Sequence, residues 1–268
     1  MTGAVAHGAT WRAPAIARAA LRFAGDLWRA VEAQHVVSTM ALVDTAEEQA
    51  VLEDLLEDGK PPLPAAAIGL HHLLFTPFRY RPPPGGSRFR GDNDPGVFYA
   101  ADEVRTACAE LGYWRWRHLL DTPTLASMPS TSQTVFRVNV VAFAVDLRDP
   151  PYAAERARWT SPDDYGACQA FGRAARDAGV RAIRYESVRD PMHAGCCAVL
   201  HPDAFAKRAP LDQQSWMLSV SREHVVWRRA HALSSESFDF DAGAWRAAKA
   251  AARRGATGRP RAVPAGKS

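Results

Sequence analysis

The chain has 268 residues, 47% of them hydrophobic, and a formal net charge of +4. This is enough apolar sequence to bury a full core, and no apolar run approaches the roughly 20 residues of a membrane span. Charged residues interrupt the N-terminal region, so we expect no signal peptide there. Four cysteines without metal-ligand spacing indicate reduced core thiols in a cytoplasmic protein: Cys108, Cys168, Cys196 and Cys197.

The basic character of the chain, with a pI near 9.0, belongs to its C-terminal end. Residues 246–268 hold seven basic residues and no acidic one, whereas residues 1–245 hold 26 basic and 29 acidic residues. The body is therefore slightly acidic. We expect a solvated, disordered tail, the alternative being a segment that contacts nucleic acid weakly.

Two helices are predicted near the N-terminus. Apolar residues at helical spacing predict an amphipathic helix over residues 15–33. Thr45 and Glu48 form a capping-box pattern that begins a second helix, and Gly59 ends it. Nothing in this part is chemically reactive, so we interpret residues 1–62 as a helical appendage that could form a dimer face.

From Pro64 onward, the predicted strands outnumber the helices, which indicates an α+β fold. An apolar run at 97–101 predicts a buried strand, and a helix led by Asp102 follows it. Residues rich in Pro, Ser and Thr predict a loop at 122–133. The other predicted elements are a strand at 134–146, a helix from Ser161 to Gly179, strands at 180–187 and 194–200, and a hairpin at 216–220 and 224–228.

Three polar residues lie at equal steps of eleven residues along a loop, a strand and a helix. Arg88 follows Gly85-Gly86-Ser87, where backbone amides and a guanidinium could hold a phosphate, although a surface arginine is the simpler alternative. Tyr99 lies at the end of the buried strand, as many core tyrosines do. Glu110 lies about 100° from the centre of the apolar face of its helix. Such a carboxylate either forms a salt bridge at the rim or faces a cleft.

Other motifs exclude several kinds of site. Ser187 lacks the G-x-S-x-G sequence of a serine hydrolase, and no Walker or Rossmann glycine pattern occurs. The histidines and cysteines form no zinc pattern, and GDNDPG at 91–96 lacks the spaced ligands of a calcium loop. We therefore expect no metal.

Ordered pieces of residues 72–205 resemble the RES-domain family, which is named for an Arg, a Glu and a Ser. These pieces are TPFRY, GSRFR, PGVFYAA, RTACAELGYWR, VFRVNVVAF, IRYESVRDP and CAVLHPDAF. The resemblance places the three name-giving positions on Arg88, Glu110 and Ser187. It places additional binding positions on Arg79, Tyr80 and Tyr99.

The resemblance implies a fold like that of ADP-ribosyltransferases, in which a split, curved β-sheet binds NAD as substrate. It implies a toxin that degrades NAD by hydrolysis or phosphorolysis, paired with an Xre-type helix-turn-helix antitoxin through which any contact with nucleic acid would occur. A protein ADP-ribosyltransferase using the same site, and a non-catalytic binding module, are the alternatives. The predicted division is a helical segment at 1–62, a RES domain at 63–230 and a C-terminal segment at 231–268.

Chemical roles follow if NAD is the substrate. Cleavage of the nicotinamide–ribose bond builds positive charge on the ribose, which Glu110 would stabilise. Arg88, assisted by Arg79, would bind the pyrophosphate, because a guanidinium can form paired hydrogen bonds. Tyr99 or Tyr80 would stack on the nicotinamide. Ser187 would form a hydrogen bond with the nicotinamide amide or the ribose.

Overall fold

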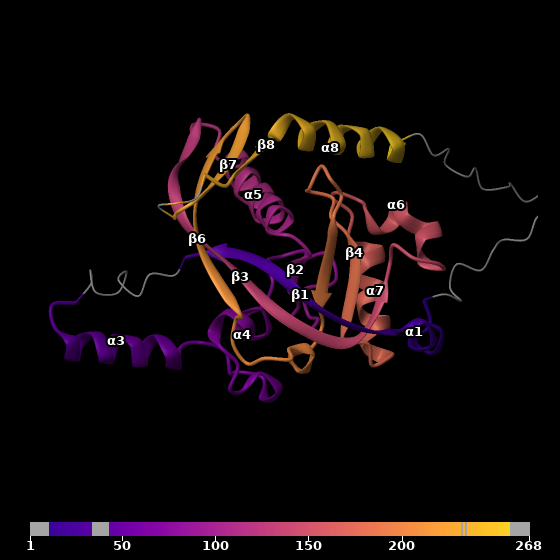
Figure 1. The fold of residues 1–268 in the computed structure, drawn as a ribbon, viewed down its shortest axis with the longest axis horizontal. Coiled ribbons are helices and arrows are strands. Elements are labelled where there is room, and N and C mark those ends of the chain that lie inside the picture. The colour runs from indigo at the N-terminus through magenta and orange to yellow at the C-terminus, as the bar shows by residue number, and fades with distance from the viewer. Residues whose placement is uncertain (1–10, 34–42, 232, 234, 258–268) are drawn as a thin grey trace, which may run out of the picture.

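A computed structural model describes residues 11–33, 43–231, 233 and 235–257 of the chain (Figure 1). The helices are α1 (Ala13–Ala19), α3 (Ala46–Asp58), α4 (His72–Arg79), α5 (Val104–Leu120), α6 (Arg156–Trp159), α7 (Gly166–Asp177) and α8 (Ala242–Thr257). The strands are β1 (Leu21–Glu32), β2 (Phe98–Ala101), β3 (Ser127–Asp146), β4 (Ala182–Glu186), β5 (Gly195–Val199), β6 (Asp212–Ser221), β7 (His224–Arg229) and β8 (Ser237–Asp241). Short 3-10 helices lie at Ala65–Ala67, Tyr152–Glu155 and Pro202–Ala204.

The strands form one curved, mostly antiparallel sheet in the order β1-β2-β5-β4-β3-β6-β7-β8, with a further pairing of β1 with β3 (Figure 1). The long strand β3 joins the two parts of this sheet. Its N-terminal half pairs with β6, and its C-terminal end pairs in parallel with β4. Because one strand has two partners on successive stretches, the sheet splits there. The predicted α+β class with a split, curved sheet is confirmed.

The helix predicted over residues 15–33 is wrong for most of its length. Helix α1 ends at Ala19, and β1 pairs with β3 from Leu21↔Ala144 to Glu32↔Gln133. The sequence of this stretch also alternates with a period of two, and Gly25 at its centre disfavours a helix. Tertiary pairing with β3 therefore decides its conformation. The division of the chain at residue 62 stays a prediction, and β1 joins the segment before that point to the sheet.

Other predicted boundaries need correction. Residues 127–133, predicted as loop, belong to β3, where a register shift between Met128 and Thr131 accommodates Pro129. Helix α7 begins at Gly166 rather than at Ser161, because the Ser161 hydroxyl accepts the Asp164 N–H and closes a turn instead. The C-terminal tail is helical as far as Thr257, and residues 258–268 lie outside the described ones.

The remaining elements lie close to their predicted positions. The strands predicted at 97–101, 180–187 and 194–200 are β2, β4 and β5, and the predicted hairpin is formed by β6 and β7. Helix α3 has the predicted capping box, in which Thr45 and Glu48 each accept a backbone N–H of the other, and it ends at Gly59. A positive φ of 73° at Gly179 ends the turn after α7.

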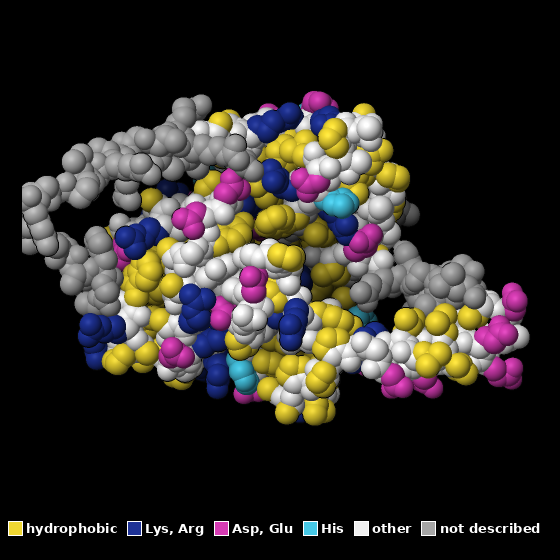
Figure 2. All heavy atoms as spheres, turned by 180° about the vertical axis from the view of Figure 1, so that it is seen from behind, with side chains coloured by type: hydrophobic (Ala, Val, Ile, Leu, Met, Phe, Trp, Pro, Cys, Tyr) yellow, Lys and Arg dark blue, Asp and Glu magenta, His cyan; other side chains and the backbone are white. Residues whose placement is uncertain are grey.

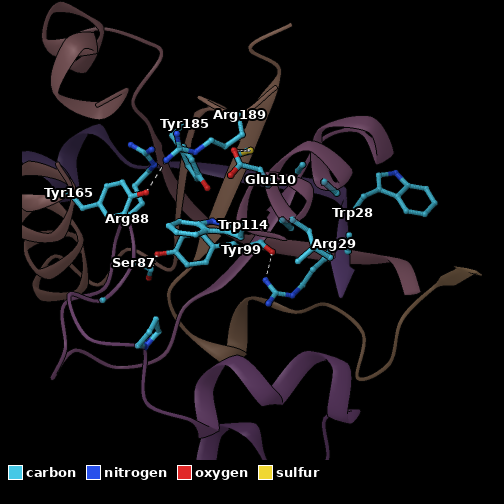
Figure 3. A pocket seen from close by; sticks show the side chains of 18 residues that line it. Trp28, Arg29, Ser87, Arg88, Tyr99, Glu110, Trp114, Tyr165, Tyr185 and Arg189 are labelled. Carbon is cyan, nitrogen blue, oxygen red and sulfur yellow. Dashed lines mark hydrogen bonds between the residues drawn. The ribbon is translucent and has the colours of Figure 1, made fainter. Parts of the chain in front are cut away.

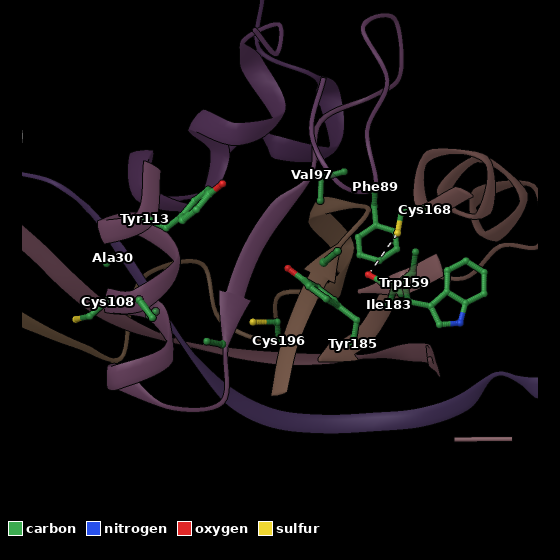
Figure 4. Packing of buried hydrophobic residues seen from close by; sticks show 14 of the residues in the cluster. Ala30, Phe89, Val97, Cys108, Tyr113, Trp159, Cys168, Ile183, Tyr185 and Cys196 are labelled. Carbon is green, nitrogen blue, oxygen red and sulfur yellow. Dashed lines mark hydrogen bonds between the residues drawn. The ribbon is translucent and has the colours of Figure 1, made fainter. Parts of the chain in front are cut away.

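Two hydrophobic clusters lie on opposite faces of the sheet. One lies under α5 and α7 and contains Phe89, Tyr185 and Cys196, with the Phe89 and Tyr185 rings 4.9 Å apart (Figure 4). The other lies under α4 and contains Phe98 and Phe136. Burial of β5 between these clusters explains its unbroken apolar sequence. No helix within the described ranges is long and apolar enough to cross a membrane.

Candidate functional site

A cavity of about 330 Å³ opens on the face of the sheet that α5 covers. Its lining comes from β1, β2, α5, the turn at 86–88, the segment before α7 and the residues around β4 and β5 (Figure 3). The volume lies at the lower end of the range typical of small-molecule sites. In the view from behind that of Figure 1, hydrophobic side chains surround a hollow near the centre of the molecule (Figure 2). Segments far apart in the sequence therefore meet around one space.

Glu110 supplies the carboxylate of the cavity. It projects from the second turn of α5, whose other side packs into the core through Cys108 and Ala109. Its Oε1 accepts the hydroxyl of Ser187 at 2.6 Å and lies 3.9 Å from the Sγ of Cys196. Burial, and then the negative charge of Glu110, raise the pKa of Cys196 well above its ordinary value, so the thiol stays protonated and donates to the carboxylate. Ser187 and Cys196 thus fix the orientation of the Glu110 carboxylate.

Ser187 lies behind Glu110 and does not line the cavity. Its side chain is fully buried just after β4. Its Oγ accepts the backbone N–H groups of Arg189 and Asp190 at 3.2 and 3.0 Å, while its own O–H goes to Glu110. The structure therefore brings Ser187 and Glu110 together, and it places the serine behind the carboxylate, outside the lining of the cavity.

Arg88 lies at the tip of a tight turn in which Ser87 and Arg90 pair with each other. Gly86 precedes this turn with a positive φ of 71°, and a Cβ there would lie 2.1 Å from the Arg90 carbonyl oxygen, so only glycine fits. Arg88 is 8% exposed, and its guanidinium donates from Nη1 to the carbonyl oxygens of Trp159 and Ser161 at 2.7 and 3.0 Å. It also lies over the Tyr165 ring.

Tyr99 links strand β2 to the turn that carries Arg88. Its hydroxyl accepts the Phe89 N–H at 2.9 Å and lies 2.8 Å from the hydroxyl of Ser87. Burial raises the pKa of Tyr99, so the phenol stays neutral at physiological pH. Its ring lines the cavity, and its hydroxyl supports the turn.

The structure does not bring Arg79 and Tyr80 into the cavity. Arg79 forms an ion pair with Glu57 of α3 at 2.6 Å and donates from Nε to the Pro61 carbonyl oxygen. Tyr80 ends α4 with a side chain 38% exposed. The expected contact of these two residues with a ligand is not supported by this arrangement, because α4 packs on the opposite face of the sheet.

Several lining residues escaped the sequence-based reasoning: Trp28, Arg29, Trp114, Tyr165, Tyr185 and Arg189. Two of them had a usable signal. Trp114 lies one helical turn after Glu110, and Arg189 lies two residues after Ser187. Arg29 could not be found, because its segment was predicted as a helix.

The cavity is rich in positive charge. Arg29, Arg88 and Arg189 line it together with the single carboxylate of Glu110. Among the ion pairs of the described residues, none involves these three arginines. Their guanidinium groups donate to backbone carbonyls and, for Arg189, also to a tyrosine hydroxyl. Burial lowers the pKa of Arg29 to about 10. A site of this kind favours an anionic ligand.

The RES domain family matches residues 63–221, more than half of the chain. The chain belongs to the RES-domain family. This RES domain includes β2 to β6, whereas β1, β7, β8 and α8 lie outside the match. The comparison with curated proteins gave no match. A chain of the crystal structure of the M. tuberculosis MbcT–MbcA toxin–antitoxin complex is similar at 12% identity and a TM-score of 0.44, covering 89% of this chain and 96% of that one.

The three residues that the sequence resemblance places at the name-giving positions of the family have distinct surroundings here. Arg88 and Glu110 line the cavity, and Ser187 holds Glu110. Within the described ranges, no group of three or more His, Cys, Asp or Glu residues is placed to hold a metal ion.

Proposed function

We propose that this RES-domain protein is an NAD-consuming enzyme that cleaves the bond between nicotinamide and ribose, by hydrolysis or phosphorolysis. The observation that carries the proposal is Glu110, a carboxylate held at 2.6 Å by Ser187. It lies in a cavity that also presents aromatic rings and guanidinium groups without an ion pair among the described residues. NAD offers a partner for each of these groups. Its ribose becomes positively charged beside the carboxylate, its nicotinamide ring can stack on an aromatic ring, and its pyrophosphate can bind the guanidinium groups.

In the proposed reaction, the bond between the anomeric carbon and the nicotinamide nitrogen breaks, and the electron pair leaves with the now neutral nicotinamide. The carbon acquires positive charge, which Glu110 stabilises from its fixed position. An oxygen of water or phosphate then bonds to the same carbon. Water gives up a proton to solvent in this step, whereas an unprotonated phosphate oxygen has none to lose. No step requires a change of oxidation state.

The other residues would bind and orient the substrate. Arg88 would contact the pyrophosphate, since its guanidinium lines the cavity without an ion-pair partner among the described residues. Tyr99 would offer its ring to the nicotinamide. Ser187 would act as a positioning residue through Glu110, rather than as a contact of the nicotinamide. Held in this way, the carboxylate needs little reorganisation as charge develops.

We further propose that the protein is a toxin restrained by an antitoxin. This is the role that the resemblance to the RES-domain family implies. The exposed apolar side chains of α3, Val51, Leu55 and Leu56, offer a surface for some partner (Figure 2). Isolation of a stable complex after co-expression with the protein of a neighbouring helix-turn-helix gene would test this part. Growth inhibition that persists when that protein is co-expressed would contradict this part of the proposal.

The enzymatic proposal is tested by mass analysis of the products after purified protein is incubated with NAD, with and without phosphate. Hydrolysis yields nicotinamide and ADP-ribose, whereas phosphorolysis yields nicotinamide and phosphorylated ADP-ribose only when phosphate is present. Transfer to a protein would appear as a protein that gains the mass of ADP-ribose. Unchanged NAD under all these conditions would overturn the proposal.

A further inference from the structure

Two guanidinium groups from distant parts of the chain meet at Tyr165 in the cavity (Figure 3). Arg88 approaches from the turn before β2, and its central guanidinium carbon lies 4.8 Å from the centre of the Tyr165 ring. Arg189 approaches from the loop after β4 and donates from Nη2 to the Tyr165 hydroxyl at 3.1 Å. One tyrosine side chain therefore contacts two cations that come from distant segments.

The segment before α7 holds both arginines through backbone oxygens. Arg88 donates to the carbonyls of Trp159 and Ser161, and Arg189 donates to the carbonyl of Pro162. These acceptors are neutral dipoles. They fix the direction of each guanidinium without neutralising its charge.

Arg189 is also held by contacts with α5, with Trp245 and with Ser187. Its guanidinium carbon lies 3.7 Å from the centre of the Tyr113 ring, on α5. Its backbone carbonyl accepts the Trp245 indole N–H at 2.7 Å, and its backbone N–H goes to Ser187. Arg189 as a residue is 4% exposed, compared with 8% for Arg88. Two buried guanidinium groups in fixed positions, with no carboxylate in ion-pair contact among the described residues, are placed to bind an anion.

We propose that Arg189 and Arg88 together bind a diphosphate group, each guanidinium contacting one of the two phosphates. Arg189 thereby takes the place that the sequence suggested for Arg79, which pairs with Glu57 outside the cavity. The guanidinium plane matches phosphate oxygens in paired hydrogen bonds, and two such groups at fixed spacing select two linked phosphates over one. As a proposal about NAD, this rests on the proposed function, but diphosphate binding can be measured without any turnover.

The experiment compares binding of ADP and AMP to the full-length protein by calorimetry. ADP should bind more tightly than AMP to the wild type. Arg189→Lys keeps the charge and loses the planar fork, so it should weaken ADP binding by about tenfold and leave AMP binding within about twofold. Arg173→Lys, on an exposed arginine of α7 that pairs with Asp94, is the matched control and should change neither affinity.

A purely structural role of Arg189 gives a different pattern. If Arg189 only holds the loop after β4, Arg189→Lys weakens ADP and AMP equally, and the proposal is wrong. It is equally wrong if the wild type does not prefer ADP, or if the variant keeps that preference. Should Arg189→Lys fail to fold, Tyr165→Phe decides, because it keeps the ring beside Arg88 and removes the hydroxyl that Arg189 contacts. Tyr165→Phe should reduce the ratio by which the protein binds ADP more tightly than AMP. An unchanged ratio overturns the proposal.

Failure of the proposed function leaves a separate signature. A wild-type protein that does not consume NAD, yet prefers ADP in a manner dependent on Arg189, has the diphosphate site without the activity. A protein that consumes NAD but shows no such preference has the activity without this site.

Discussion

The hydroxyl of Ser187 donates to Oε1 of Glu110 at 2.6 Å, and the direction of this hydrogen bond is fixed. The backbone N–H groups of Arg189 and Asp190 both point at the same Ser187 oxygen and occupy it as an acceptor. The one remaining hydrogen, that of the hydroxyl, goes to the carboxylate. The loop after β4 therefore orients the carboxylate on α5.

We expect Ser187→Ala to lower kcat by about tenfold and to leave KM within about twofold, because the serine acts through Glu110. Loss of the acceptor also leaves two buried N–H groups unpaired, which should lower the free energy of unfolding by about 1–3 kcal/mol. Steady-state kinetics and urea unfolding measure the two effects. Ser130→Ala, at an exposed serine of β3, is the control. A higher KM with an unchanged kcat would instead make Ser187 a substrate contact.

Glu110→Gln keeps the size of the side chain and an oxygen for the Ser187 hydroxyl, but removes the negative charge. If that charge stabilises a cationic ribose, the loss of one preorganised group should cost about 2.7–4 kcal/mol, or about 100- to 1,000-fold in kcat. Glu103→Gln, at an exposed residue just before α5, controls for the loss of a negative charge near the same helix. NAD turnover within a few-fold of wild type, in a folded Glu110→Gln protein, would remove Glu110 from the mechanism.

The sequence predicted Glu110 and Arg88 because each had a local signal: a carboxylate at the margin of an apolar helix face, and an arginine after a Gly-Gly turn. It could not place Arg79, whose partner Glu57 lies on a different helix. Nor could it find Arg29, since the conformation of β1 depends on pairing with β3, more than 100 residues away. Local patterns therefore predicted the residue types of the site, and long-range pairing decided which of them meet.

Exchanging Arg88 and Arg79 for lysine in turn should separate the arginine of the cavity from the one outside it. Arg88→Lys loses the fork that faces two carbonyls and the cavity, so we expect KM for NAD to rise by about tenfold or more. Arg79→Lys keeps a cation beside Glu57 and should leave KM within about twofold. Initial-rate measurements over a range of NAD concentrations test both. Equal effects of the two substitutions would show that Arg79 also reaches the substrate.

Buried thiols should make the protein less stable in alkaline solution. Burial raises the pKa of Cys197 from 9.0 to about 12, and the pKa values of Cys108 and Cys196 also lie well above the ordinary value. Between the unfolded and folded pKa values, the thiol ionises in the unfolded chain but not in the folded one. The stability that is present below pH 9 is therefore lost progressively as the pH rises from 9 toward 12.

We expect the free energy of unfolding to fall between pH 8 and pH 9.5 by on the order of 1 kcal/mol for each such thiol. Urea unfolding in the presence of a reductant, at several pH values across this window, measures the slope. Cys197→Ala removes one titrating group and should make the slope shallower, whatever its effect on stability at pH 8. Arg29 does not obscure the result, because with its pKa lowered to about 10 it stays mainly charged in both states throughout the window. A slope identical in the wild type and in Cys197→Ala would mean that this thiol does not ionise preferentially in the unfolded chain.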